Sequence, residues 1–177
     1  MTKIIITILI SVMLLITAAA YSEPSQDRKR ALDILWSAYT KLQQGDPTAI
    51  DGIEQALRID PNFAYANIVR AEFAMASEDW ENARIYYQKG LEHLHEPDQP
   101  LSPVPSIRIT AEEVEADSRV FLGYTYIKLA QMANVQGQNQ LEIEYLDSAK
   151  ANLLKAVNLN PGPETKKMAE QLLMMFH

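Results

Sequence analysis

The sequence contains no cysteine, and its 6 glycines are scattered along 177 residues. The absence of cysteine excludes disulfides, a thiol nucleophile, a zinc–thiolate site and a lipid-anchored cysteine. The scattered glycines form no phosphate-binding loop. Positive charge is also scarce, because 16 Lys and Arg residues face 23 Asp and Glu residues, which leaves a formal net charge of −7. Such an acidic chain is not expected to bind nucleic acid.

Residues 1–20 have the pattern of a secretory signal peptide. Lys3 precedes an apolar run from Ile4 to Ile16, and the small residues that follow end at Ala20. This order of charge, apolar core and small residues is typical of a leader that is removed during export. We expect cleavage after Ala20, with a site after residue 22 as the alternative.

A cleaved leader predicts a periplasmic or secreted protein without stable membrane insertion. An inner-membrane anchor through residues 4–20 is the minor alternative, because this run is at the short limit for crossing a bilayer. The remaining chain, residues 21–177, carries a formal charge of −8 once Lys3 is removed. It is long enough to bury a core without disulfides.

The chain beyond the leader repeats its pattern with a period of 34 residues and no gap. When the sequence is shifted by 34, small residues fall on small ones and large apolar residues on large ones. The matching pairs are Ile34 and Ile68, Leu35 and Val69, Ser37 and Ala71, Tyr39 and Phe73, Ala49 and Ala83, Ile53 and Tyr87, Ala56 and Gly90, and Leu57 and Leu91.

Each unit divides at turn signals into two segments with helical spacing of apolar residues. The first unit, about residues 30–61, has helices expected at 31–43 and 47–59, with Asp46 as the N-cap and Pro47 in the first helical position. The second unit, about residues 62–96, has helices expected at 63–76 and 80–94.

The spacing of the small residues resembles that of the tetratricopeptide repeat (TPR) family. The unit of that family carries small residues at positions 8, 20 and 27, a large one at 24 and a proline near 32. These positions hold Ser37, Ala49, Ala56, Ile53 and Pro61 in the first unit, and Ala71, Ala83, Gly90, Tyr87 and, in place of proline, His95 in the second. Small residues let antiparallel helices approach closely. The resemblance implies an all-α, TPR-type α-solenoid of about three helix-turn-helix repeats.

A third, stretched unit follows at about residues 111–161. Its opening residues Leu122, Gly123 and Tyr126 have the family's L-G-x-x-Y spacing, and its later residues Ala149, Leu153, Ala156 and Pro161 also match the family's pattern. Gly123 and Ala149 are 26 residues apart, whereas Ala71 and Ala83, at the same family positions, are 12 apart. The 14 extra residues predict two elongated helices, at about 111–136 and 139–158, each longer by about two turns.

Two further segments complete the chain. The proline-rich loop of residues 97–110 contains four prolines, which exclude a helix there, and we interpret it as a spacer or lid. At its end, Thr110 and Glu113 have the spacing of a capping box that opens the next helix. Residues 163–177 predict a C-terminal capping helix that covers the open end of the solenoid; its apolar residues are Met168, Leu172, Met175 and Phe176.

No arrangement of residues points to catalysis, a metal or a cofactor. His93 and His95 are two residues apart near a helix end, whereas a metal pair on a helix needs a spacing of four. Glu112 and Glu113 lie in a first helical turn, where the helix dipole favours negative charge. We therefore expect a non-enzymatic protein without catalytic residues, metal site or cofactor.

In TPR proteins, positions 2, 5, 9 and 12 of each unit line the concave groove, and the resemblance assigns them this role here. The partner-binding residues so predicted are Ile34, Lys41, Tyr65, Ile68, Glu72, Met75, Tyr124 and Ile127, beside Ala31, Ala38, Asp117 and Val120. This set is rather apolar, which favours a protein segment over a phosphate or carboxylate ligand. The alternative for each residue is packing against a neighbouring helix.

These features predict a protein-interaction scaffold or adaptor of the cell envelope, which binds a segment of a partner protein in its groove. One alternative is a self-associating structural module, a homodimer formed through the long hairpin of residues 111–158 or through the C-terminal helix. Another is a small-ligand-binding accessory subunit of an envelope transport system.

Overall fold

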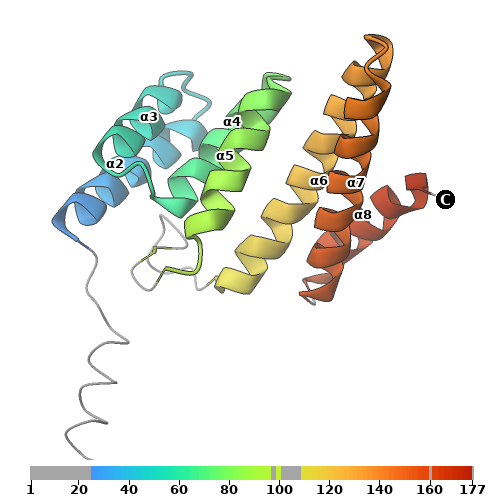
Figure 1. The fold of residues 1–177 in the computed structure, drawn as a ribbon. Helices are drawn as coiled ribbons and strands as arrows, with labels where there is room; N and C mark the ends of the chain where they lie inside the picture. The colour runs from blue at the N-terminus through green and yellow to red at the C-terminus, as the bar shows by residue number, and fades with distance from the viewer. Residues whose placement is uncertain (1–24, 97–98, 101–108, 160, 177) are drawn as a thin grey trace, which may run out of the picture.

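The computed structural model describes residues 25–96, 99–100, 109–159 and 161–176. The predicted signal peptide and most of the proline-rich loop therefore lie outside the described residues. Within these ranges, three antiparallel helix pairs stand side by side, and α8 lies against the last pair (Figure 1). The helices are α2 (Gln26–Gln43), α3 (Ala49–Ile59), α4 (Ala64–Ala76), α5 (Trp80–His93), α6 (Ala111–Val135), α7 (Asn139–Asn158) and α8 (Pro163–Leu173), with a final 3₁₀ turn η1 (Met174–Phe176).

The all-α solenoid with an elongated third pair and a C-terminal capping helix is confirmed. The helices of the third pair, α6 and α7, have 25 and 20 residues, against 13 and 14 in α4 and α5. The extra length makes this hairpin the tallest element of the stack (Figure 1).

Side-chain caps set several helix starts. The Ser25 hydroxyl accepts the backbone N–H of Arg28 (3.1 Å), so α2 begins five residues before the expected position 31. The predicted capping box of α6 is confirmed. Glu113 N–H donates to the Thr110 hydroxyl (3.2 Å), and Thr110 N–H donates to the Glu113 carboxylate (2.9 Å).

Helix α3 begins later than expected. The Asp46 carboxylate accepts the N–H of Thr48 (2.8 Å), and the Asp46 carbonyl accepts the N–H of Ala49 (3.1 Å). Asp46 thus closes a turn that contains Pro47, and the α-helix itself starts only at Ala49. The prediction of Pro47 as the first helical residue was therefore wrong, because the turn takes up two residues before helical hydrogen bonding starts.

Each helix pair crosses at a glycine. A methyl group added to Gly52 would lie 2.8 Å from the Ala38 Cβ atom, and one added to Gly90 would lie 2.7 Å from the Ile68 side chain and 3.0 Å from the Ala64 carbonyl oxygen. At Gly123 the added methyl group would lie 2.8 Å from Leu153. These contacts leave no room for a side chain, so the two helices of each pair approach as closely as ridge-and-groove packing allows.

The first helix of each pair buries the same small–large–small pattern at residues i, i+4 and i+7. The three sets are Ala31, Leu35 and Ala38 in α2, Ala64, Ile68 and Ala71 in α4, and Ala116, Val120 and Gly123 in α6. Equivalent residues of α2 and α4 are therefore 33 residues apart, whereas those of α3 and α5 keep the expected 34.

The predicted register of α2 was wrong by one residue. The 34-residue alignment paired Ser37 with Ala71, but Ser37 is exposed. Its neighbour Ala38 is 1% exposed and contacts α3 at Gly52. The alignment matched residue size alone, and both Ser37 and Ala38 are small, so it could not distinguish which of them faces α3.

Helix α4 joins the two hydrophobic clusters of the solenoid. One of its sides packs against α2 and α3, and the opposite side packs against α5 and belongs to the cluster that continues to α8. The first cluster contains Ala31, Leu35, Ala38, Ile53, Ala56, Phe63, Ala66 and Val69. The second contains Ala64, Ile68, Ala71, Tyr87, Leu94, Val114, Val120, Leu122, Tyr126, Ile127, Leu129, Ala149, Leu153, Ala156 and Ala169. Because α4 is buried on both sides, the first pair is anchored to the rest of the chain through it.

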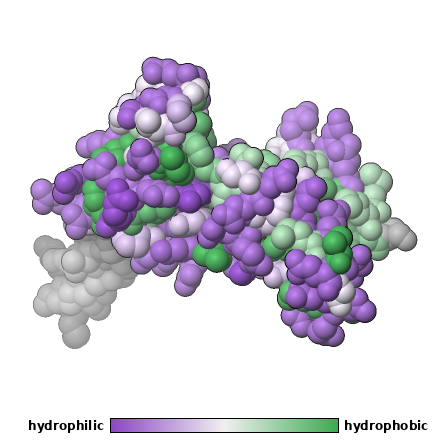
Figure 2. All heavy atoms as spheres, turned by 90° about the horizontal axis from the view of Figure 1, so that it is seen from above, coloured by the Kyte–Doolittle hydropathy of each residue, from purple (hydrophilic) through white to green (hydrophobic). Residues whose placement is uncertain are grey.

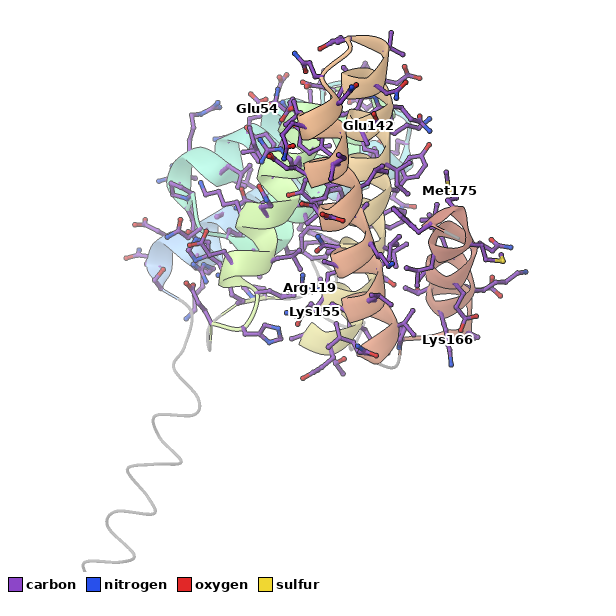
Figure 3. The ribbon with its side chains drawn as sticks, turned by 45° about the vertical axis from the view of Figure 1, so that its right-hand side comes forward. Glu54, Arg119, Glu142, Lys155, Lys166 and Met175 are labelled. Carbon is purple, nitrogen blue, oxygen red and sulfur yellow. The ribbon has the colours of Figure 1, made fainter. Side chains whose placement is uncertain are left out.

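A buried carboxylate fixes the base of the long hairpin. Glu115 oxygens lie 2.6 Å from His95 Nε2, 2.7 Å from Arg119 Nε and 3.2 Å from Lys155 Nζ. Figure 3 shows Arg119 and Lys155 close together at this end of the hairpin. Burial alone would raise the pKa of Glu115, but the hydrogen bonds from His95, Arg119 and Lys155 outweigh it and lower the pKa to about 2. The cluster ties the end of α5 to both α6 and α7.

Gln99 caps α4 from a distance. No side chain at the start of α4 accepts its free N–H groups. The Gln99 side chain, 35 residues further along, accepts the N–H of Ala64 (2.9 Å) and donates to the carbonyl of Asn62 (2.9 Å). The backbone N–H groups at a helix start need such acceptors. The Gln99 side chain therefore caps α4, as the side chains of Ser25 and Thr110 cap α2 and α6.

Replacement of Gly90 by alanine tests the close helix contact. The change favours helix by about 1 kcal/mol, but the added methyl group meets the fixed Ala64 carbonyl, and overpacking costs about 1–3 kcal/mol. We expect Gly90→Ala to lower the free energy of unfolding by about 1 kcal/mol, measured by urea denaturation. In Gly123→Ala the added methyl group would lie 2.8 Å from the side chain of Leu153, but the nearest backbone oxygen, that of Ala149, would be 3.3 Å away, so a smaller loss is expected. A Gly90→Ala protein as stable as the wild type would contradict this packing.

Replacement of Glu115 by glutamine tests the buried cluster. Its pKa in the folded chain, about 2, lies below the ordinary 4.5, so its stabilisation is complete above pH 4.5 and is lost as the pH falls towards 2. We expect Glu115→Gln to lower the free energy of unfolding by about 3 kcal/mol at pH 7. The difference from the wild type should shrink between pH 4.5 and 2. Glu112→Gln, in the exposed first turn of α6, is the control. A constant difference at every pH would argue against the assignment.

Candidate protein-binding face

The first helices of the pairs, together with α8, form one side of the solenoid, which we call the A-helix face. Its side chains include Tyr39 on α2, Tyr65 and Glu72 on α4, Asp117 on α6 and Thr165 on α8. Tyr39 is close enough to Tyr65, and Asp117 to Glu72, for the charge of one to raise the pKa of the other. The second half of α2 thus lies near the first turn of α4, and the second half of α4 lies near the first turns of α6.

Two groups on the A-helix face have strongly raised pKa values. Glu72 is open to water on one side, but the surrounding protein displaces much of its solvent. This desolvation, and then the negative charge of Asp117, raise the pKa of Glu72 to about 7. Desolvation also raises the pKa of Tyr65 to about 12, with smaller contributions from Glu72 and Tyr39. The face therefore places carboxylates among aromatic rings with little stabilisation of their charge.

At its C-terminal end, the A-helix face contains a cleft between α6 and α8, with a volume of about 480 Å³. The Thr165 hydroxyl donates to the Asp117 carboxylate across this cleft (2.5 Å). The residues that line it are Asp117, Val120, Phe121, Glu164, Thr165, Lys167, Met168 and Gln171. Apolar and acidic side chains therefore meet in one hollow of a size suited to a side chain or a short peptide segment.

Of the eight predicted partner-binding residues, Tyr65 and Glu72 lie together on the A-helix face. Asp117, which the TPR positions also assigned to the groove, joins them there. Met75 is half-buried in the last turn of α4. Whether these residues contact a partner stays a prediction.

Other predicted residues serve the packing of the solenoid. Ile68 and Ile127 are 5% and 3% exposed, and both belong to the second hydrophobic cluster. Tyr124 packs edge-on against Trp80, with 5.9 Å between the ring centres. The long hairpin causes this contact, because α6 continues past the end of α4 and reaches the start of α5.

In α2 the structure places a different residue on the A-helix face. Ile34 packs against the first hydrophobic cluster, and Lys41 is exposed, with its Nζ atom 3.4 Å from the hydroxyl of Thr48 before α3. Tyr39 lies beside Tyr65 instead. The one-residue error in the register of α2 accounts for this difference, because it moved every assignment on that helix.

Sequence reasoning missed the cleft. Thr165, Met168 and Leu172 lie on one side of α8, at helical spacing, and this spacing correctly indicates a helix that covers the solenoid. It does not indicate that α8 leaves a hollow beside Phe121 of α6, because that depends on how the two helices dock.

A second cleft, of about 410 Å³, lies between the free end of the long hairpin and η1. Large apolar side chains are exposed around this end, and Figure 2 shows hydrophobic spheres at the C-terminal side of the molecule. Figure 3 shows Met175 at the C-terminal end of the last helical segment, the end opposite to Lys166. The exposed residues are Met132 (45%), Val135 (87%), Ile143 (54%), Met174 (66%) and Met175 (60%). A homodimer through this region stays a prediction.

Two other kinds of site were sought in the part of the chain that the structure describes. No group of three or more His, Asp or Glu side chains there could hold a metal ion. No helix in that part is long and apolar enough to cross a membrane.

The raised pKa of Glu72 predicts a pH-dependent stability. Between pH 4.5 and 7 the folded chain binds a proton that the unfolded chain releases, so the stability contributed by this residue falls as the pH rises through that window. Above pH 7, Glu72→Gln should therefore have a higher free energy of unfolding than the wild type, measured by urea denaturation. The expected gain is only about 1 kcal/mol, because water still reaches the Glu72 carboxylate. The two should converge near pH 4.5. Glu92→Gln, on the exposed side of α5, is the control, and parallel curves for Glu72→Gln would contradict the prediction.

Comparison with known proteins supports the fold. No protein-family model and no curated protein sequence matches the chain. Among solved structures, it is similar to the N-terminal domain of stress-induced protein-1 (STI-1) from C. elegans, with a TM-score of 0.56 and 14% sequence identity. The match covers 84% of this chain and 98% of that one. That domain is a TPR-like helical domain, and the chain therefore has a TPR-like α-helical fold.

Proposed function

We propose that this protein is a non-enzymatic interaction module that holds a segment of a partner protein on its A-helix face. The observation that carries the proposal is the combination on this face of partly exposed tyrosines, the desolvated Glu72 carboxylate and a cleft of about 480 Å³. Stacked helix pairs expose such a face along their concave side, where an extended or helical segment fits.

Packing of the solenoid does not require an ionisable carboxylate at Glu72. Glu72 carries a raised pKa and therefore costs stability at neutral pH, whereas a neutral residue would not. Groups that cost stability and yet lie together on one open face are candidates for binding. The TPR-like fold is consistent with this role, although a fold alone does not determine a function.

We also propose that the protein acts in the cell envelope. This part rests on the sequence of residues 1–20, in which Lys3, the apolar run and Ala20 follow the order of an export signal. The partner is then expected among envelope or secreted proteins.

Cross-linked pull-down from the envelope fraction tests the binding face. The bait is the full chain, and the variant is Tyr65→Ala. We expect the wild type to retain a partner and Tyr65→Ala to retain at least about tenfold less, which corresponds to the loss of one anchoring aromatic contact. Ile85→Ala is the matched control, because Ile85 is 46% exposed on α5, the second helix of its pair.

Equal retention by wild type and Tyr65→Ala would contradict the proposed face. An empty pull-down with intact, folded bait would contradict the proposed function itself. Circular dichroism of both variants separates loss of binding from loss of fold.

A further inference from the structure

The cleft between α6 and α8 combines an apolar floor with an acidic mouth. Val120, Phe121 and Met168 supply the apolar part. Asp117 and Glu164 carry negative charge at the lining, against one positive charge from Lys167. Glu72 on α4 does not line the cleft, but it is near enough to Asp117 for the charge of Asp117 to contribute to its raised pKa.

Neither Glu72 nor Asp117 pairs with a cation in the part of the chain that the structure describes. Asp117 accepts a hydrogen bond from the neutral Thr165 hydroxyl, which satisfies one oxygen and leaves its charge unpaired. Elsewhere in the chain a desolvated carboxylate is paired, as Glu115 is with Arg119 and Lys155.

A buried hydroxyl adjoins this site and lacks a partner. Tyr87 is 0% exposed, and its hydroxyl makes no hydrogen bond within the described residues. Its ring stacks on Phe121, a residue of the cleft, with 6.4 Å between the ring centres. Burial, and then the charge of Glu72, raise the pKa of Tyr87. An unpaired buried hydroxyl costs free energy unless a ligand or water completes it.

The charges decide which ligand fits. An anionic group would meet the combined field of Glu72, Asp117 and Glu164, which repels it. A purely apolar segment would cover the two unpaired carboxylates and desolvate them further, at a cost in free energy. A long cationic side chain avoids both costs, because its aliphatic stem packs on apolar residues while its charged head pairs with carboxylates.

We propose that this cleft receives a lysine or arginine side chain from the partner segment that lies on the A-helix face. The stem packs against Val120, Phe121 and Met168, and the charged head pairs with Asp117, whose charge also acts on Glu72. This inference rests on the proposed function and adds the chemistry of the partner, a segment with a basic residue among apolar neighbours.

The test uses four pools of acetylated, amidated, fluorescent octapeptides with one fixed central residue, which is arginine, lysine, norleucine or glutamate. Fluorescence anisotropy with the full chain measures their binding. We expect the arginine and lysine pools to bind at least about tenfold more tightly than the norleucine pool, and the glutamate pool to bind most weakly. The double variant Glu72→Gln with Asp117→Asn should reduce the preference below about threefold. Glu112→Gln, on α6 but outside the cleft, should keep it.

Three results would overturn the proposal: equal binding of the norleucine and basic pools, a basic preference that survives the double variant, or no binding by any pool. If all pools bind equally and Tyr65→Ala abolishes their binding, the A-helix face is the binding site and the basic side chain is not its ligand. If no pool binds and the envelope pull-down is also empty, the proposed function fails as well. Asp117→Asn retains the acceptor for Thr165, so the variants remain close to the native packing.

Discussion

The close approach of the two helices in each pair is the constraint on which the rest of the structure depends. At the crossing point of each pair, a glycine without a side chain lets the backbones of the two helices approach closely; these residues are Gly52, Gly90 and Gly123. Because the paired helices touch, their outer sides can also pack, and α4 is buried between the first pair on one side and α5 on the other. The first helices of the three pairs, α2, α4 and α6, then lie side by side with one side exposed to solvent. The A-helix face is thus a geometric consequence of residues that contribute almost no side chain themselves.

The electrostatic pattern of the solenoid divides into two kinds of site. At the base of the long hairpin, Glu115 is buried and fully paired, so its charge strengthens the contact between α5, α6 and α7. On the A-helix face, Glu72 is desolvated and lies near Asp117, and neither carboxylate has a counter-charge among the described residues. The same residue type therefore serves the fold in one place and costs stability in the other. This contrast is a basis of the proposal that the face binds a partner, whose contacts would stabilise it.

Local features of the sequence predict much of this fold. Thr110 and Glu113 are three residues apart, so their capping box can be recognised without any tertiary information. The equivalence of Ala83 in α5 with Ala49 in α3 likewise follows from spacing alone. The choice between Ser37 and Ala38 does not, because it depends on which side of α2 meets Gly52. The cleft beside Thr165 could not be predicted for the same kind of reason, since it depends on how α8 docks against α6.

The contact between Gln99 and the start of α4 affects how the chain acquires its structure. Most packing joins helices that are adjacent in sequence, so each pair can form soon after its residues become available, which favours rapid folding. The N–H of Ala64, however, finds its side-chain acceptor only 35 residues later, and His95 finds Glu115 only after α6 has begun. The second pair therefore cannot reach its final stability before the third starts to form. The folding of neighbouring repeats is therefore coupled. A chain that ends near residue 96 would form the second pair without the contacts from Gln99 to the start of α4 and from Glu115 to His95.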